Sequence, residues 1–323
     1  MSRATFVLRR FGFALLATYI VMSIAFFVVA LMPDPNLGLV AYGAEDPEAA
    51  VAAVKEAKNL DEPLLDRYVN WLVDLSTLDW GRSVGSFGNK RAPVTDLLAE
   101  TIPRTLAYVL PALALSFGLA LAIGSYAAMN PDSRLTSFVS TTGYFGLGLP
   151  NYFLAALVTF GLAVELGLQP TYPGDPLGAL VGDPLSVWGY LLPTLVLTST
   201  LTGGQLRYVR AESAEILGED FIKLVRSTGA GNLRIVRHVL SNAALPLVSL
   251  VFADMVSTLV VQVFVLEFVF PVRGLGSLAL QAIRDRNVPV IIGTTMAVAY
   301  AGIGANFLQD VAYAWFDPRA DFE

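Results

Sequence analysis

Long stretches without charge constrain this chain more than any other feature of its sequence. A bilayer has a hydrocarbon core about 30 Å thick, so a helix that crosses it needs about 20 mostly apolar residues. Six stretches meet that length, and their only charged residues are Asp254 and Asp310. The stretches are 11–32, 105–129, 135–164, 185–206, 243–266 and 288–316. One soluble core cannot bury this many, so we expect an all-α membrane protein with six transmembrane helices.

The composition agrees with a membrane protein and excludes several kinds of site. Only 15% of the 323 residues are charged, whereas soluble domains carry roughly 25%. The chain has no cysteine, which excludes disulfides and thiolate chemistry, and its single histidine, His238, cannot form a multi-histidine metal site. We therefore expect no metal site. The net charge of −6 argues against nucleic acid as a partner, and this acidic balance favours a halophilic source.

The first stretch is interpreted as a retained helix rather than a cleaved signal peptide. It follows Arg3, Arg9 and Arg10, as the apolar region of a signal peptide would. However, it is longer than the usual 7–15 residues or so of such a region, and no A-x-A cleavage site follows it.

Positive residues in the short loops predict the orientation of the chain. The amino end is basic and so is the loop 207–241, whereas the loop between the third and fourth stretches contains no lysine or arginine. We therefore expect a protein of the cell membrane with both termini and the loop 207–241 on the cytoplasmic side. The predicted parts are a first helix at 1–32, an extracytoplasmic insertion at 33–103 with short helices at 48–59 and 63–75, and a transmembrane module at 104–316.

The loop 207–241 has a helical pattern of its own. Its apolar residues predict one face of a helix and its charged residues predict the opposite face. The apolar set is Leu217, Phe221, Leu224 and Val225, and the charged set is Glu219, Asp220, Lys223 and Arg226. Gly229 and Gly231 break this helix, and a second helix is expected over 233–240 before Pro246 opens the fifth stretch. Such a projection needs either a lipid surface or the groove of a partner protein.

An ordered set of residues in and after this loop carries a family resemblance. The set is Gly218, Glu219, Asp220, Phe221, Ile222, Arg226, Gly229, Val236, His238, Leu240, Asn242, Ala243, Leu245 and Pro246. It resembles the EAA signature of binding-protein-dependent ABC transporter permeases, in the version of the dipeptide, oligopeptide and nickel class. The chain departs from that signature at Leu224 and at Ser227–Thr228, near the usual Ala-Arg-Ala-Lys of the family.

Shorter fragments extend the resemblance over the whole chain. In order, they are Phe6–Arg10, Met32–Pro35, Asn59–Pro63, Asp79–Ser83, Pro103–Leu106, Glu267–Pro271 with Gly274–Gly276, Asp310–Tyr313 and Asp317–Arg319. Each fragment alone is weak, but their order and spacing are similar to those of the family.

The resemblance implies a fold, a function and a set of partners. The implied fold is the type I ABC importer permease, and the implied partners are a second, different permease, two ABC ATPase subunits, an extracytoplasmic solute-binding protein and membrane lipid. ATP and magnesium would be bound by the ATPase, so this chain would hold no cofactor and no catalytic residue. It contains no G-x-x-x-x-G-K-[ST] phosphate loop. The residues implied to dock on the ATPase are Glu219, Asp220, Phe221, Lys223, Leu224, Arg226, Gly229, Gly231, His238, Asn242 and Pro246, with His238 expected to pack or to bind a carbonyl group.

Polar residues inside the apolar stretches are candidates for a translocation path. Asp254 and Gln262 are eight residues apart and fall near one helix face, and Asn306 lies in the sixth stretch near Gln309 and Asp310. The alternative is that these side chains only bond helices together. Glu165 and Glu267 are expected near the outer ends of their stretches, where water reaches them. Pro150, with Gly146 and Gly148, is expected to interrupt the third stretch.

Other functions and substrates remain open from the sequence. A secondary transporter or channel would show paired half-repeats, and a membrane enzyme would need a polar catalytic cluster; neither is evident. Within the family, peptides are the first choice of substrate, and nickel or a saccharide is the alternative.

Overall fold

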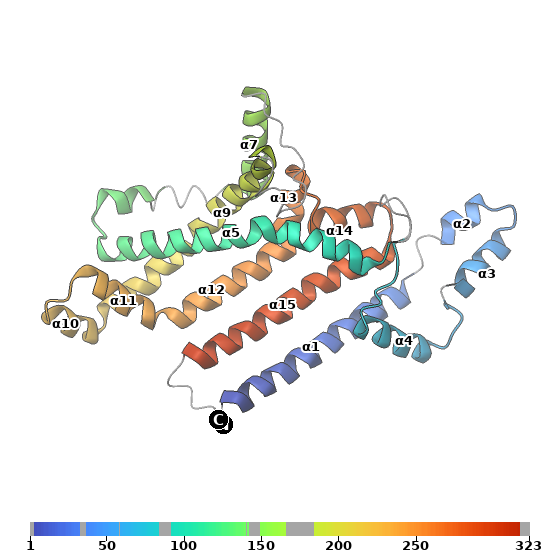
Figure 1. Ribbon diagram of the computed structural model, residues 1–323, viewed down its shortest axis with the longest axis horizontal. Helices are drawn as coiled ribbons and strands as arrows, with labels where there is room; N and C mark the ends of the chain where they lie inside the picture. Colours follow the sequence, from blue (N-terminus) through green and yellow to red (C-terminus); the bar gives the residue numbers. More distant parts are fainter. Residues whose placement is uncertain are drawn as a thin grey trace. The chain divides into compact units, whose positions relative to one another are not determined.

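Helices make up the fold. The computed structural model describes residues 3–32, 37–57, 59–83, 92–139, 141, 149–165 and 184–316, and in that part the one β element is an isolated bridge between Arg82 and Pro93. The helices, labelled in Figure 1, are α1 (Arg3–Leu31), α2 (Leu37–Gly43), α3 (Pro47–Ala57), α4 (Leu64–Ser76), α5 (Val94–Met129), α7 (Asn151–Glu165), α9 (Pro184–Gly218), α10 (Asp220–Ser227), α11 (Asn232–Asn242), α12 (Ala244–Ser257), the π turn η1 (Thr258–Gln262), α13 (Val263–Val269), α14 (Leu275–Arg284) and α15 (Val288–Phe316).

Four helical segments are long and apolar enough to cross a membrane. They are Thr5–Leu31, Val94–Met129, Ala244–Val269 and Val288–Trp315. They correspond to the first, second, fifth and sixth predicted stretches. α9 covers the fourth stretch, but its threonine, serine and glycine residues make it less hydrophobic than the four long segments. α7 has 15 residues and covers only part of the third stretch. The all-helical class is confirmed, and the count of six spans stays a prediction.

One predicted boundary is confirmed by the structure and another changes. The third stretch is interrupted at Pro150, as expected: residues 149–150 are not helical, and α7 begins at the next residue with Phe153 N donating to Pro150 O at 3.0 Å. Gly146 and Gly148 lie outside the described residues. The fourth helix does not end at 206 but continues to Gly218, because residues 205–217 contain no glycine or proline that would stop it.

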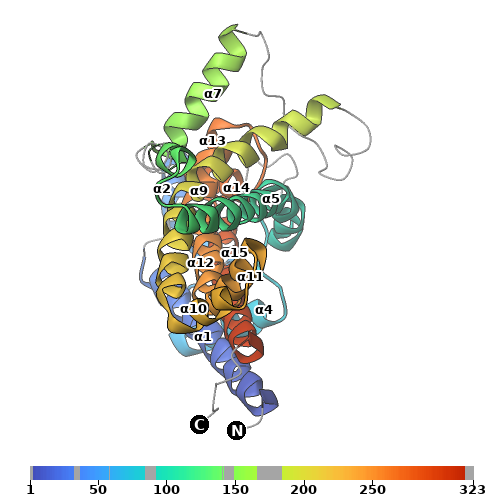
Figure 2. The ribbon, with the colours of Figure 1, turned by 90° about the vertical axis from the view of Figure 1, so that its left-hand side faces the viewer.

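The chain divides into two compact units, of which the first is Met1–Leu8, Thr101–Ser277 and Ala305–Glu323. Its core joins α5, α9, α10, α11 and α12 through buried apolar residues, namely Ala120, Leu206, Val209, Ile216, Ile222, Ile235, Val239, Ala243 and Leu247. A Cβ at Gly124 would lie 2.9 Å from a methyl group of Val209, so glycine lets α5 and α9 approach closely. α7 packs beside α13, as Figures 1 and 2 both show.

The second unit is Arg9–Glu100 and Leu278–Gly304. Here α4 packs along α1: Trp71 Nε1 donates to Met22 O at 3.1 Å, and the hydroxyls of Ser23 and Tyr68 are 2.8 Å apart. Met22, Leu75 and Met296 are buried together. α3 and α4 confirm the two short helices that were predicted over 48–59 and 63–75.

Candidate functional site

The predicted docking loop forms two short helices joined by a tight turn, which we call the knob: α10, residues 228–231 and α11. Gly229 has φ +77°, a left-handed conformation that suits glycine, and its N–H donates to Arg226 O at 3.0 Å to close α10. Gly231 has an ordinary φ of −72° and precedes α11, where its carbonyl accepts from Arg234 N and Ile235 N. The predicted helix–break–helix pattern is confirmed, and Gly229 is the residue that the turn requires.

The inner face of the knob is apolar and anchors it to the spans. Ile222 is fully buried, and Ile235 and Val239 are almost so, in one cluster with Ile216 of α9 and Leu247 of α12. The knob therefore packs directly against α9 and α12, and closely packed side chains of this kind do not deform freely.

One predicted face of α10 is wrong. Phe221 and Leu224 are 38% and 68% exposed, whereas Ile222, which was not in the predicted apolar set, occupies the core. Successive residues of a helix are about 100° apart, so Leu224 lies ~200° from Ile222 and points away from it. Leu217 and Val225 do pack against the core. α10 thus has apolar side chains on two opposite sides.

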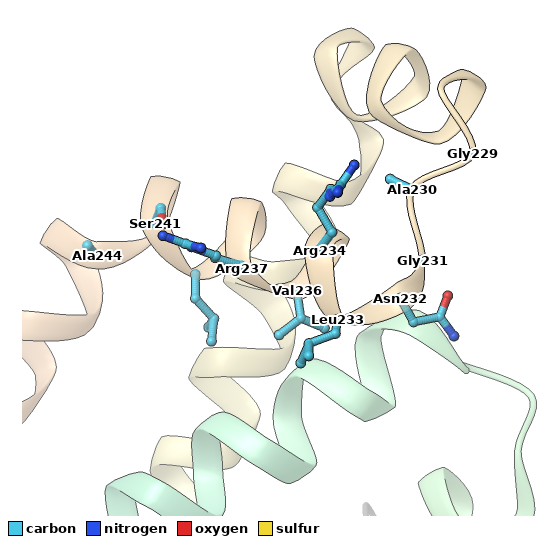
Figure 3. A pocket seen from close by; sticks show the side chains of 11 residues that line it. Gly229, Ala230, Gly231, Asn232, Leu233, Arg234, Val236, Arg237, Ser241 and Ala244 are labelled. Atoms are coloured by element: carbon cyan, nitrogen blue, oxygen red, sulfur yellow. The ribbon is translucent and has the colours of Figure 1, made fainter.

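The outer face of the knob combines apolar and basic groups. Leu233 is 84% exposed, and Arg226, Arg234 and Arg237 are exposed as well. An open hollow of about 1100 Å³ is lined by residues from the 229–231 turn and along α11 to Ala244, as Figure 3 shows.

The remaining predicted docking residues at the knob are exposed. Glu219 and Asp220 are exposed at the start of α10, and Lys223 Nζ is 2.7 Å from Asp220 Oδ1 in a pair open to solvent. Asn242 ends α11, where its Nδ2 donates to His238 O at 2.8 Å. The His238 side chain is exposed, so packing, one of its two expected roles, is wrong, and a bond to a carbonyl group stays a prediction.

Pro246 stands in the first turn of α12 and is half-buried. Proline has no backbone N–H, and the N–H groups in the first turn of a helix have no partner within the helix, so proline suits this position.

The candidates for a translocation path are held by different neighbours. Gln205 Nε2 of α9 donates to Asp254 Oδ2 at 2.7 Å, and Asn151 Nδ2 of α7 donates to Gln262 Oε1 at 3.2 Å. Asn306 is exposed and takes part in neither of these two hydrogen bonds. The structure therefore brings Asn306 together with neither residue.

A π turn changes the relation between Asp254 and Gln262. η1 adds one residue to the span after Ser257. Eight residues then correspond to about seven helical steps, or ~700°, which is close to two full turns. The prediction that the two residues share a face is therefore supported.

A cavity of about 500 Å³ lies between α9 and α12 beside Asp254. It is lined by Thr200, Leu201, Gly204, Gln205, Arg207, Tyr208, Ala211, Leu250 and Asp254. Polar side chains thus line a partly open space between α9 and α12.

Glu267 is a buried residue whose role the sequence did not indicate. The prediction that water reaches it is wrong, since it is only 3% exposed. Its Oε1 accepts from Thr105 Oγ1 at 2.6 Å and from Tyr108 OH at 3.2 Å, and its Oε2 accepts from Ser277 N at 2.8 Å. The side chain of Glu165, also expected near an outer end, lies outside the described residues.

This carboxyl group ties three helices together. Thr105 Oγ1 also accepts from Leu275 N at 2.8 Å, so α5, α13 and the first turn of α14 share one network. A Cβ at Gly274 would be 2.2 Å from Glu267 Oε1 and 2.4 Å from Thr105 Oγ1. Glycine at 274 therefore leaves the room that the carboxyl group occupies.

Comparison with known proteins covers almost the whole chain. Residues 120–322 match the family model described as "Binding-protein-dependent transport system inner membrane component". Residues 3–115 match the model described as "Binding-prot-dependent transport system membrane comp, N-term".

Three relatives illustrate the match. The oligopeptide transport system permease protein AppB of Bacillus subtilis is 28% identical over 268 residues, 83% of this chain and 84% of AppB. A putative peptide transport system permease protein of Brucella abortus is 29% identical over 320 residues, 98% of this chain and 99% of that protein. The metal-staphylopine import system permease protein CntB of Staphylococcus aureus is 27% identical over 319 residues, 97% of each chain.

Proposed function

The chain belongs to the family of binding-protein-dependent transport system inner membrane components, and we propose that it is one membrane-spanning subunit of an ATP-driven importer of dipeptides or oligopeptides. The observation that carries this proposal is the match along the chain to permeases named for peptide transport. A second candidate substrate is a metal chelate, because CntB, named for metal–staphylopine import, matches this chain over a similar length.

The topology belongs to the same proposal. We infer six spans, which are the four long apolar helices together with α7 and α9. The protein would lie in the cell membrane with both termini on the cytoplasmic side. Residues 33–103, which include α2, α3 and α4, would form the extracytoplasmic insertion. A solute-binding protein would deliver the substrate to that side, and a second, different permease would complete the path.

The knob is proposed to dock on a separate ATPase. Its exposed Leu224 and Leu233 offer apolar contact, and the arginines around them offer donors for carboxylates. The alternative surface for such residues is lipid. A protein partner is favoured because the basic and apolar groups line a hollow, into which a side chain of a partner can fit, rather than a flat stripe.

Coupling would follow from the continuity of α9. Gln205 beside the cavity and Ile216 beside the knob lie on one helix, about 16 Å apart at 1.5 Å per residue. ATP-driven closure of two ATPase subunits would move the knob, α9 would move with it, and the cavity would change its opening. The ATPase can shift the permease between its two conformations only by binding one of them more tightly than the other.

Affinity purification of the tagged chain in mild detergent tests the proposal. The expected result is recovery of an ATPase, a second permease and a solute-binding protein, with ATP-dependent uptake of peptide after reconstitution. Recovery of the chain alone, in a form that moves solute into liposomes without ATP, would overturn it in favour of a secondary transporter or channel.

A further inference from the structure

We propose that Gln205 and Asp254 form a binding site for the primary ammonium group of the transported peptide in the cavity between α9 and α12. This inference rests on the proposed function and adds the chemical group that this chain itself recognises.

The first observation is a buried acceptor without a partner. Gln205 is 1% exposed, its Nε2 is used by Asp254, and its Oε1 has no hydrogen-bond partner in the described structure. The assignment of Nε2 to the Asp254 side follows from the chemistry, because an ionised carboxylate only accepts. A buried amide oxygen left without a donor is unfavourable, and each such group in a folded protein calls for an explanation.

The second observation is the neighbouring carboxylate. Asp254 makes a single hydrogen bond among the described residues, through Oδ2 to Gln205, so Oδ1 remains available. Asp254 and Gln205 both line the 500 Å³ cavity. The cavity is therefore lined by a carboxylate with an available oxygen and by an amide whose buried oxygen has no partner, with the positive charge of Arg207 on the same lining.

The chemistry of these groups selects the ligand. Two acceptors with a negative charge favour a cation that has several N–H donors, and a primary ammonium has three. A divalent metal ion would need more oxygen or nitrogen ligands, and no group of three His, Cys, Asp or Glu residues is present in the described part of the chain. Arg207 also lines the cavity, but no ion pair joins it to Asp254 within the described residues.

The walls of the cavity suit the rest of a peptide. Leu201 and Leu250 provide apolar surface, and Thr200 and Tyr208 lie at the same cavity. Leu201, Gly204, Ala211 and Leu250 thus make no specific demand on the side chains of a peptide, as expected where different peptides pass after a binding protein has selected them.

The chain offers a direct test because it contains no cysteine. Thr200→Cys places a single thiol in the cavity, and Ala214→Cys places a control thiol on an exposed part of α9. Both are made in the full chain within the reconstituted transporter. Two thiol reagents are compared, the cationic aminoethyl methanethiosulfonate and the anionic sulfonatoethyl methanethiosulfonate. Mass spectrometry follows the modification of this chain by each reagent. The measurement is repeated after Asp254→Asn and after Asp254→Glu are introduced into each cysteine variant.

The expected result is a preference for the cationic reagent at Thr200→Cys that falls about tenfold with Asp254→Asn, the size of enrichment that a charged cleft produces. Asp254→Glu should keep the preference, and Ala214→Cys should not respond to either substitution. An unchanged preference in Asp254→Asn would overturn the proposal. The modification rates can be measured without any transport, so this experiment is separate from the test of the proposed function. The proposed function fails if the wild-type transporter takes up no peptide.

Protection by peptides identifies the source of the ammonium. An excess of unblocked tetraalanine should slow modification of Thr200→Cys, and N-acetylated tetraalanine should not. An N-acetylated peptide with one lysine reports whether a side-chain ammonium also serves. If neither amine-containing peptide protects, the site attracts inorganic cations only and the proposal is wrong.

Discussion

Replacement of Gly274 by alanine should disrupt the network around Glu267. The new Cβ would stand 2.2 Å from Glu267 Oε1 and 2.4 Å from Thr105 Oγ1, where contacts closer than about 3 Å are repulsive. A free glutamate end would swing aside at little cost. This one is buried and held by Thr105, Tyr108 and Ser277, so it moves only if those bonds break.

The magnitude follows from two contributions. Overpacking in a well-packed interior costs about 1–3 kcal/mol, and loss of a buried hydrogen bond to the carboxyl group costs roughly 1–3 kcal/mol more. The sum is on the order of 2–6 kcal/mol. At about 2–4 °C for each kcal/mol, the value for domains of roughly 150–250 residues, the expected fall in melting temperature is about 4–24 °C.

The assay is the apparent melting temperature of the detergent-solubilised complex at one fixed heating rate, because unfolding of such proteins is often irreversible. Gly118→Ala is the matched control, since a Cβ there has nothing within 4 Å, and it should be neutral or slightly stabilising. Glu267→Asp, which shortens the side chain, should recover part of the loss in the double variant. Equal melting temperatures for Gly274→Ala and Gly118→Ala would refute this reasoning.

Three further predictions concern the knob and the helix that leads to it. Leu224→Glu should reduce recovery of the ATPase at least tenfold without a change in melting temperature, whereas Ala214→Glu should leave recovery unchanged; equal recovery from both variants would exclude Leu224 from the interface. Gly229→Val should lower both recovery and melting temperature, because a side chain with φ +77° costs roughly 1–2 kcal/mol, and Gly229→Asn should lower them less; a silent Val variant contradicts the role of the turn. Burial and the negative charge of Glu215 raise the pKa of Glu212. A carboxyl group whose pKa is raised by folding stabilises the fold while it is protonated and loses that contribution as the pH rises through the folded pKa. Glu212→Gln should therefore raise the melting temperature slightly at neutral pH and not near pH 4, and the absence of any pH dependence would contradict this effect.

The sequence predicted those features that depend on local physical requirements. An uncharged stretch of 20 or more residues has few alternatives to a helix, and all six stretches lie at least partly in helices where they are described. The knob was also predictable, because its break depends on Gly229, whose left-handed φ is a local property.

Features that depend on distant partners were not predictable. Periodicity showed that α10 has apolar residues, but only the packing against α9 and α12 shows that Ile222 lies inside and Leu224 outside. Likewise Glu267 stands close to the end of an apolar stretch and was expected in water. It is buried because Thr105 and Tyr108, about 160 residues earlier, supply its donors. Gly274 was the available signal, since a glycine can mark a place where other atoms approach the backbone closely.

The π turn at Thr258–Gln262 gives the span from α12 to α13 one residue of spare length. A relative that lacks one residue here would form the span as an ordinary α-helix, and its two halves would keep the same relative orientation, because seven ordinary helical steps also give ~700°. The positions of Asp254 and Gln262 would still share a face. A single residue can therefore be gained or lost at this point during evolution while the side chains on either half of the span keep their directions.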